Sequence, residues 1–145
     1  MSLRLVFDEN IGRPLVMALA GLLRFAADPP EIKHLLEITE MYGAKDNEWI
    51  PKLASGGWIV VSADHGRKGG AKLPLLCRQH RITHVLLSPA LCNEKQLVKA
   101  LALLSVWPRL LELPAKPAGS RFVLVKGSHH AFLTEKAPPA TPARD

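Results

Sequence analysis

The most informative segment of the chain is Trp58-Ile59-Val60-Val61-Ser62-Ala63-Asp64. Its apolar run is nearly continuous, which is typical of a strand in a parallel sheet that is covered on both faces. The N-terminal segment Leu3-Arg4-Leu5-Val6-Phe7-Asp8 has the same form, a short apolar run that ends abruptly in an acid. These two segments predict buried parallel strands, each with an aspartate at its carboxyl end.

Segments with helical spacing alternate with short apolar runs along the rest of the chain. Helices are expected over residues 12–25, 46–55, 73–80 and 93–107, and further strands over 31–36, 83–87 and 121–126. This alternation predicts an α/β fold with a single doubly wound, mostly parallel sheet, the strand order 2-1-3-4-5 and helices on both faces. The domain is expected to span residues 1–134, and the proline-rich residues 135–145 are expected to form a disordered tail.

Two local features refine this outline. Asn93 is expected to cap the helix that runs to about Trp107, with Gln96 as its capping-box partner. The last expected strand, 121–126, is flanked by basic residues, which favours a place at the edge of the sheet.

Composition limits the class of protein. With 145 residues, of which 48% are hydrophobic and 22% charged, the chain is long enough for one domain with a buried core. The formal net charge of +6 excludes a strongly acidic protein and is compatible with a polyanionic partner. Residues 1–64 contain six Lys or Arg and nine acids, whereas residues 65–145 contain thirteen and four. This asymmetry indicates an acidic site beside a phosphate-binding surface.

The sequence lacks the features that are typical of a secreted or membrane protein. Cys77 and Cys92 are its only cysteines and form no CxxC motif, which fits a reducing cytoplasm. An acid follows the first apolar residues too soon for a signal peptide, and the apolar stretches are too short to span a bilayer. We therefore expect a cytoplasmic protein with no membrane partner.

Four acids are expected to gather at one edge of the sheet. In open α/β sheets, ligands bind beyond the carboxyl ends of the strands, at the point where the winding reverses. In the order 2-1-3-4-5 the first and third strands are neighbours there, so Asp8 and Asp64 would face one another. Glu9 adjoins this pair, and Asp46, at the start of a helix, opens toward the same rim. Clustered carboxylates need a cation, and hard oxygen ligands suit Mg²⁺ or Mn²⁺ rather than zinc.

A glycine-rich basic loop, His65-Gly66-Arg67-Lys68-Gly69-Gly70-Ala71-Lys72, follows the acid at the end of the third strand. Arg67, Lys68 and Lys72 can hold phosphates, and the glycines allow backbone amides to approach them. His65 can contact substrate or transfer a proton. A solvated loop without such a role explains the same residues equally well, and the loop contains no Walker A motif.

These segments, in this order, resemble a known family. Leu5-Val6-Phe7-Asp8-Glu9-Asn10-Ile11, then Asp46-Asn47-Glu48-Trp49-Ile50, then the segment from Trp58 to Gly66 are similar to the PIN-like ribonuclease domain. More narrowly, they resemble the compact PIN-like toxins of the VapC type. The resemblance extends from the first strand through at least the fourth.

The resemblance implies a metal-dependent RNA endonuclease of the cytoplasm, whose usual partner is a cognate antitoxin, and a homodimer is possible. By position, Asp8, Asp46 and Asp64 would be the catalytic ligands of Mg²⁺ or Mn²⁺, with Glu9 as an added acid. The ion would activate a water for in-line attack on phosphorus. A fourth acid, common in larger PIN domains, has no obvious counterpart among the acids after Asp64, which leaves open whether one or two ions bind.

Two other classes remain open. Receiver domains share this strand order, and Asp8, Glu9, Asp64, Ser88 and Lys126 fall at comparable strand ends, but Lys126 is followed by a glycine where receivers usually have proline. A non-catalytic binding module could also keep a PIN-like fold.

The remaining distinctive side chains have simpler explanations. Trp49, Trp58 and Trp107 lie in or beside apolar runs, so they are expected in the core rather than as platforms for stacking bases. His129 and His130 form a short polar pair near the tail with no evident partner in the sequence.

Overall fold

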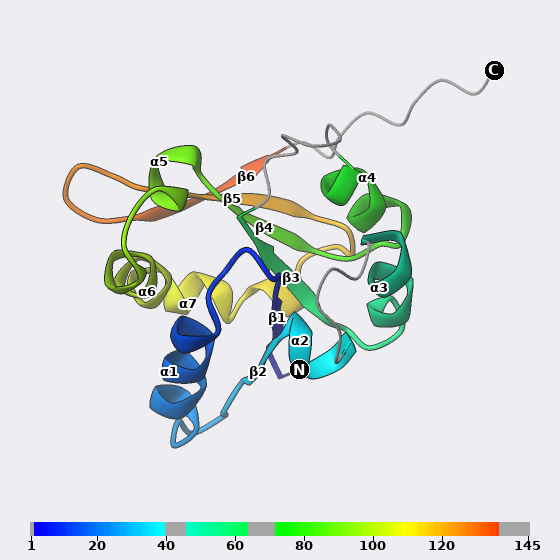
Figure 1. Cartoon of the computed structure of the whole chain (residues 1–145), viewed down its shortest axis with the longest axis horizontal. Coiled ribbons are helices and arrows are strands. Elements are labelled where there is room, and N and C mark those ends of the chain that lie inside the picture. Colours follow the sequence, from blue (N-terminus) through cyan, green and yellow to red (C-terminus); the bar gives the residue numbers. More distant parts are fainter. Residues whose placement is uncertain (1, 40–45, 64–71, 137–145) are drawn as a thin grey trace.

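Within the described residues, 2–39, 46–63 and 72–136, the computed structural model contains one sheet of six strands (Figure 1). The first five strands are parallel, and the sixth runs antiparallel to the fifth. In the order β2-β1-β3-β4-β5-β6, the predicted α/β class and the order of the first five strands are confirmed. The strands are β1 (Arg4–Phe7), β2 (Glu31–His34), β3 (Ile59–Ser62), β4 (His84–Leu87), β5 (Arg121–Val125) and β6 (Phe132–Lys136).

Helices cover both faces of this sheet, as predicted. We call the two sides the α1–α6 face, where α7 also packs, and the α3–α4 face (Figure 1). The helices are α1 (Arg13–Leu23), α2 (Leu35–Thr39), α3 (Asp46–Leu53), α4 (Lys72–Gln79), α5 (Pro89–Cys92), α6 (Gln96–Ser105) and α7 (Trp107–Leu110), followed by a short 3-10 turn (Leu113–Ala115).

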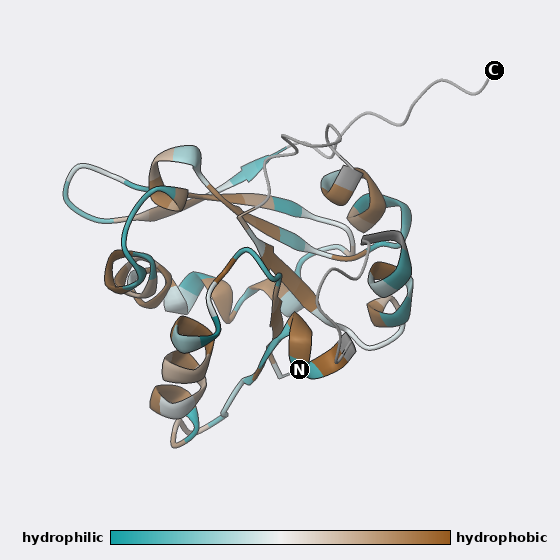
Figure 2. Ribbon diagram, in the orientation of Figure 1, coloured by the Kyte–Doolittle hydropathy of each residue, from teal (hydrophilic) through white to brown (hydrophobic). Residues whose placement is uncertain are grey.

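The alternation of side chains along each strand divides the core between the two faces. Leu5 and Phe7 of β1 point to the α1–α6 face, whereas Val6 between them points to the α3–α4 face and lies in one cluster with Trp49. Figure 2 shows hydrophobic colour along most of β3, in the middle of the sheet. The unbroken apolar pattern of β1 and β3 therefore arises because helices bury both sides of these strands. Trp49 is in the core as predicted, with 1% of its surface exposed, whereas Trp58 is only partly buried.

The segment expected as one helix over 93–107 contains α6 and the first residue of α7, and the N-cap of α6 is Lys95 rather than Asn93. A separate short helix, α5, begins one turn before Asn93. Ser88 is its N-cap, because Ser88 has an extended backbone and its Oγ accepts from the Leu91 N–H at 3.3 Å. Pro89 fits the first turn of α5, where its missing N–H costs nothing. Asn93 ends α5, and Gln96 is the first residue of α6 rather than a capping partner.

The strand expected at the sheet edge is covered by β6, which the sequence analysis did not predict. β5 pairs with β4 on one side and with β6 on the other, so the prediction of an edge position was wrong. The pattern of β6 is weak because only Leu133 of its five residues is buried. Glu135 and Lys136 belong to this strand rather than to the expected tail, and residues 137–145 lie outside the described part. Within the described residues, no helix has the length and apolar character of a membrane span.

Candidate functional site

The carboxyl ends of the five parallel strands meet at one edge of the sheet, which we call the carboxyl edge. β1 and β3 are neighbours there, with Phe7 beside Val61 in register. The pairing continues one residue past β1, because the Asp8 N–H donates to the Val61 carbonyl at 3.0 Å. Asp8 is therefore held against the strand that leads directly into Asp64.

The carboxylate of Asp8 is almost fully buried at this edge, with 4% of the residue exposed. Asn10 Nδ2 lies 3.5 Å from Asp8 Oδ2 and donates to it, and the Ile11 N–H donates to the Asp8 carbonyl at 3.1 Å. A buried carboxylate is costly unless hydrogen-bond donors or a cation stabilise it. Glu9, by contrast, is exposed to solvent. Asp8 therefore supplies, at a fixed position, the carboxylate oxygens that a divalent cation prefers as ligands.

Asp46 is the first residue of α3. This helix follows α2 in the connection from the carboxyl end of β2 to the amino end of β3. Trp49 and Ile50 anchor this helix to the sheet in one cluster with Val6 and Val60. The approach of the Asp46 carboxylate to Asp8 stays a prediction, because the side chain of Asp46 lies outside the described part.

The other predicted site residues fall partly or wholly outside the described part. Asp64 and the loop residues His65, Arg67 and Lys68 lie in 64–71, beyond the described residues, and so do the side chains of Asp46 and Lys72. Among the side chains that the structure describes, no group of three or more His, Cys, Asp or Glu could hold a metal ion. The joint ligand set of Asp8, Asp46 and Asp64 remains a prediction.

His34 stabilises the turn that follows β1, a role that sequence analysis missed. It is 3% exposed, ends β2 beside Phe7, and its Nε2 lies 2.7 Å from the Ile11 carbonyl. Its Nδ1 accepts from the Leu36 N–H at 3.2 Å, so the ring proton must be on Nε2, which donates to Ile11. In the sequence, His34 is only a polar residue near the end of an expected strand. That position does not distinguish a buried histidine that bonds the backbone from a histidine in an exposed loop.

Replacing His34 by phenylalanine is expected to weaken Mn²⁺ binding by up to about tenfold, the low end of the effect of removing a group bonded directly to a metal ligand, because His34 acts on Asp8 only through Ile11. The reason is that the Ile11 carbonyl loses its donor, so the turn that positions Asp8 loosens. His34→Gln is the matched control, because its amide can donate from nearly the position of Nε2. Isothermal titration calorimetry measures both variants, and equal loss of affinity in the two would contradict the role of this hydrogen bond.

A buried Ser–His pair joins the last residue of β3 to the first residue of β4. Ser62 Oγ lies 2.7 Å from His84 Nε2, and the two residues are 0% and 1% exposed. Ser62 is the last residue of β3 and precedes Asp64 by two residues. The hydrogen bond therefore links the segment just before Asp64 to β4. This contact was also missed, because residues 22 positions apart in the chain show no spacing pattern.

The groups that a receiver domain would use are engaged elsewhere. Ser88 Oγ caps α5, and the Lys126 ammonium forms an ion pair with Glu94. Among the residues that the structure describes, these two contacts give the receiver-like alternative no support.

A family model described as a PIN-like domain matches residues 3–88, which is more than half of the chain. The matched region contains β1 to β4 and therefore the strand ends that form the carboxyl edge around Asp8. No curated protein and no solved structure matched the chain.

Proposed function

Because the chain belongs to the PIN-like domain family, we propose that it is a metal-dependent endoribonuclease. The observation that supports this most directly is the position of Asp8. Its carboxylate is buried at the carboxyl edge, and its backbone is bonded to the strand that precedes Asp64. This is the place where an open α/β sheet binds its ligand.

Asp8, Asp46 and Asp64 would hold one or two Mg²⁺ or Mn²⁺ ions, with Glu9 as an additional acid near the rim. Such an ion, when bound, makes a water nucleophilic and neutralises charge on the phosphodiester. The chain's own contribution is to fix the ligands. Asn10 orients the Asp8 carboxylate, and the packing of Trp49 holds the start of α3 in place.

Arg67, Lys68, Lys72 and His65 are proposed to contact the RNA. These residues follow Asp64 in the chain, so phosphates bound by the three bases would pass close to the metal ligands. The excess of bases after residue 64 supports a polyanionic substrate, because cationic side chains displace counterions from the phosphate backbone.

The biological role that we propose is that of a cytoplasmic toxin inhibited by a cognate antitoxin protein. This proposal is supported by the narrower resemblance of three segments to the compact VapC-type toxins: residues 5–11, the start of α3, and the segment from Trp58 to Gly66. A small antitoxin-like protein encoded by the neighbouring gene would support the role further.

The activity is tested by incubating the full chain with single-stranded RNA and Mg²⁺ or Mn²⁺. Internal cleavage is expected with either ion, and a chelator is expected to abolish it until excess ion is added back. DNA of the same sequence is the control for substrate class. Absence of cleavage with every ion would contradict the enzymatic proposal and favour a non-catalytic PIN-like binding module. A stable acyl-phosphate on Asp64 after treatment with a small phosphodonor would favour a receiver instead.

A further inference from the structure

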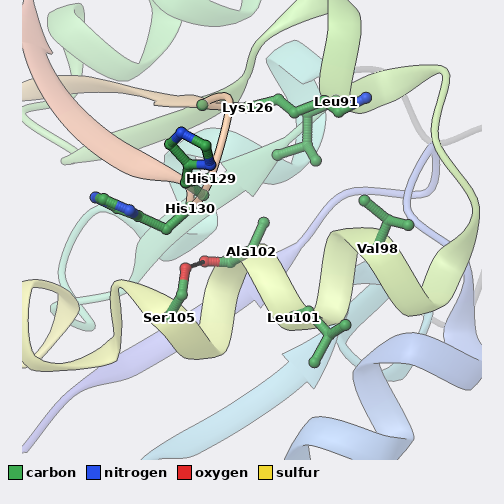
Figure 3. A pocket seen from close by; sticks show the side chains of 10 residues that line it. Leu91, Val98, Leu101, Ala102, Ser105, Lys126, His129 and His130 are labelled. Carbon is green, nitrogen blue, oxygen red and sulfur yellow. Dashed lines mark hydrogen bonds between the residues drawn. The ribbon is translucent and has the colours of Figure 1, made fainter.

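A cavity of about 360 Å³ opens between the α5–α6 region and the loop that joins β5 to β6, residues 126–131 (Figure 3). Its floor is apolar and includes Leu91, Val98 and Ala102. His129 and His130 line it from the β5–β6 loop, across from the α6 side chains. The volume is in the range of sites for small organic ligands, and an apolar wall with a few polar groups is their usual lining.

This cavity borders the same carboxyl edge as Asp8. β5 is parallel to β4 and ends at Val125, so the β5–β6 loop leaves the sheet at the edge where β1 and β3 also end. α5 lies between the cavity and the end of β3, because Leu91 lines the cavity while Cys92 Sγ lies 3.6 Å from the Ala63 carbonyl. A polymer bound along this edge would therefore reach both places.

The β5–β6 loop has a specific closed geometry. A Cβ on Gly127 would lie 2.0 Å from the carbonyl oxygen of His130, so this close approach of backbone to backbone requires glycine. Lys126, at the start of the loop, pairs with Glu94, which lies between α5 and α6. Both features constrain the path of the loop that contains the two histidines.

The chemistry of the lining favours a planar, uncharged group. The cation of Lys126 is offset by Glu94, so the rim contains no strong excess of charge that would select a phosphate. Imidazole rings stack on flat heterocycles and donate or accept hydrogen bonds at their edges. The apolar floor of α5 and α6 can accept the second face of such a ring.

We propose that this cavity binds an unstacked nucleobase of single-stranded RNA, at a distance from the phosphate that is cleaved. His129 and His130 would stack on or bond to the base, while the backbone of the same RNA crosses the carboxyl edge near Asp8. The proposal rests on the proposed ribonuclease function, because it assigns a second contact to the same substrate. Stacking against aromatic rings is a common mode of recognising single-stranded RNA.

The test compares RNA binding by the wild type, the double variant His129→Ala/His130→Ala, and Ser105→Trp, which fills the cavity from α6. Binding of a short single-stranded RNA of mixed sequence is measured by fluorescence anisotropy with chelator present, so that no cleavage occurs. The dissociation constant is expected to rise about tenfold in both variants, the scale of losing one stacked base. His80→Ala is the matched control, because His80 follows α4 at the opposite edge of the sheet and its loss is expected to leave binding unchanged.

Nucleotide titrations separate the base from the phosphate. Nucleoside monophosphates are expected to shift the imidazole NMR signals of His129 and His130, whereas ribose phosphate is not. An RNA with an abasic residue at the bound position is expected to bind the wild type as weakly as intact RNA binds the double variant. Equal shifts with ribose phosphate would overturn the assignment to a base.

The outcomes distinguish this proposal from the proposed function. If the wild type cleaves RNA and both cavity variants bind RNA as the wild type does, the base site is wrong and the ribonuclease stands. If no RNA is cleaved but nucleotides shift the two imidazoles and Ser105→Trp abolishes the shifts, the base site stands and the nuclease is wrong. If neither RNA nor nucleotides bind, the base site is overturned. The double variant changes only exposed side chains of a loop, so it also tests the site if Ser105→Trp fails to fold.

Discussion

Asp8→Asn is expected to lower metal-dependent RNA cleavage by at least about 100-fold, beyond the usual cost of losing an outer-shell partner. Asparagine keeps the size of the side chain and leaves the backbone bond from Asp8 to Val61 in place. It removes the negative charge that a hard divalent cation requires from its ligand. The ion would then bind weakly at the carboxyl edge, and a water at phosphorus would not be activated.

The measurements are the cleavage rate at saturating Mn²⁺ and the affinity for Mn²⁺ by calorimetry. Glu9→Gln is the matched control, because Glu9 is the next residue but is exposed, and we expect a clearly smaller effect. The melting temperature of Asp8→Asn is expected to be equal or higher in chelator, because a buried carboxylate is costly without a cation. A cleavage rate equal to that of the wild type would refute the role of Asp8 as a ligand.

The second large effect is expected from Trp49→Ala, which we predict to lower the free energy of unfolding by about 3–5 kcal/mol. Trp49 is 1% exposed and is the largest side chain in the cluster that joins α3 and α4 to Val6 and Val60. Its removal leaves a cavity that the surrounding helices and strands cannot fill completely. For a chain of this size, the melting temperature is expected to fall by roughly 10–16 °C.

Trp58→Ala is the control for this prediction. Trp58 is partly buried, and the guanidinium of Arg4 stacks on its ring with 4.1 Å between Cζ and the ring centroid. Its removal is expected to cost less, about 1–2 kcal/mol. Because α3 begins three residues before Trp49, we also expect Trp49→Ala to weaken Mn²⁺ binding at temperatures where it is still folded. Equal destabilisation by the two substitutions would contradict the central position of Trp49.

The accuracy of prediction differed between the centre and the edges of the sheet. β1 and β3 were found because runs such as Leu5-Val6-Phe7 are apolar at every position, a pattern that few other structures share. β6 was missed because its one buried residue, Leu133, leaves no periodic pattern. The helix expected over 93–107 was found as α6, but its N-cap was placed wrongly. Asn93 is the C-cap of α5, a separate short helix that begins after Ser88, and α6 begins after Lys95.

The residues of the candidate site also differed in how well they could be predicted. Asp8 was identified because an acid that directly follows an apolar strand is recognisable in the sequence, and the predicted strand order gave its location. His34 was missed because its hydrogen bond to Ile11 spans 23 positions and depends on β2 pairing with β1. The Ser62–His84 pair and the cavity beside His129 and His130 likewise require neighbours from different strands and helices.

The α/β class, the order of the five parallel strands and the position of Asp8 at a strand end follow from the amino-acid sequence alone. Hydrophobic periodicity is a local property, and a parallel strand buried on both faces is apolar at nearly every residue. The polar side chains that support Asp8, and the cavity on the same edge, become apparent only in the folded chain. Hydrogen bonds and cavities depend on groups brought together by packing, and their energies are not encoded in the spacing of residues along the chain.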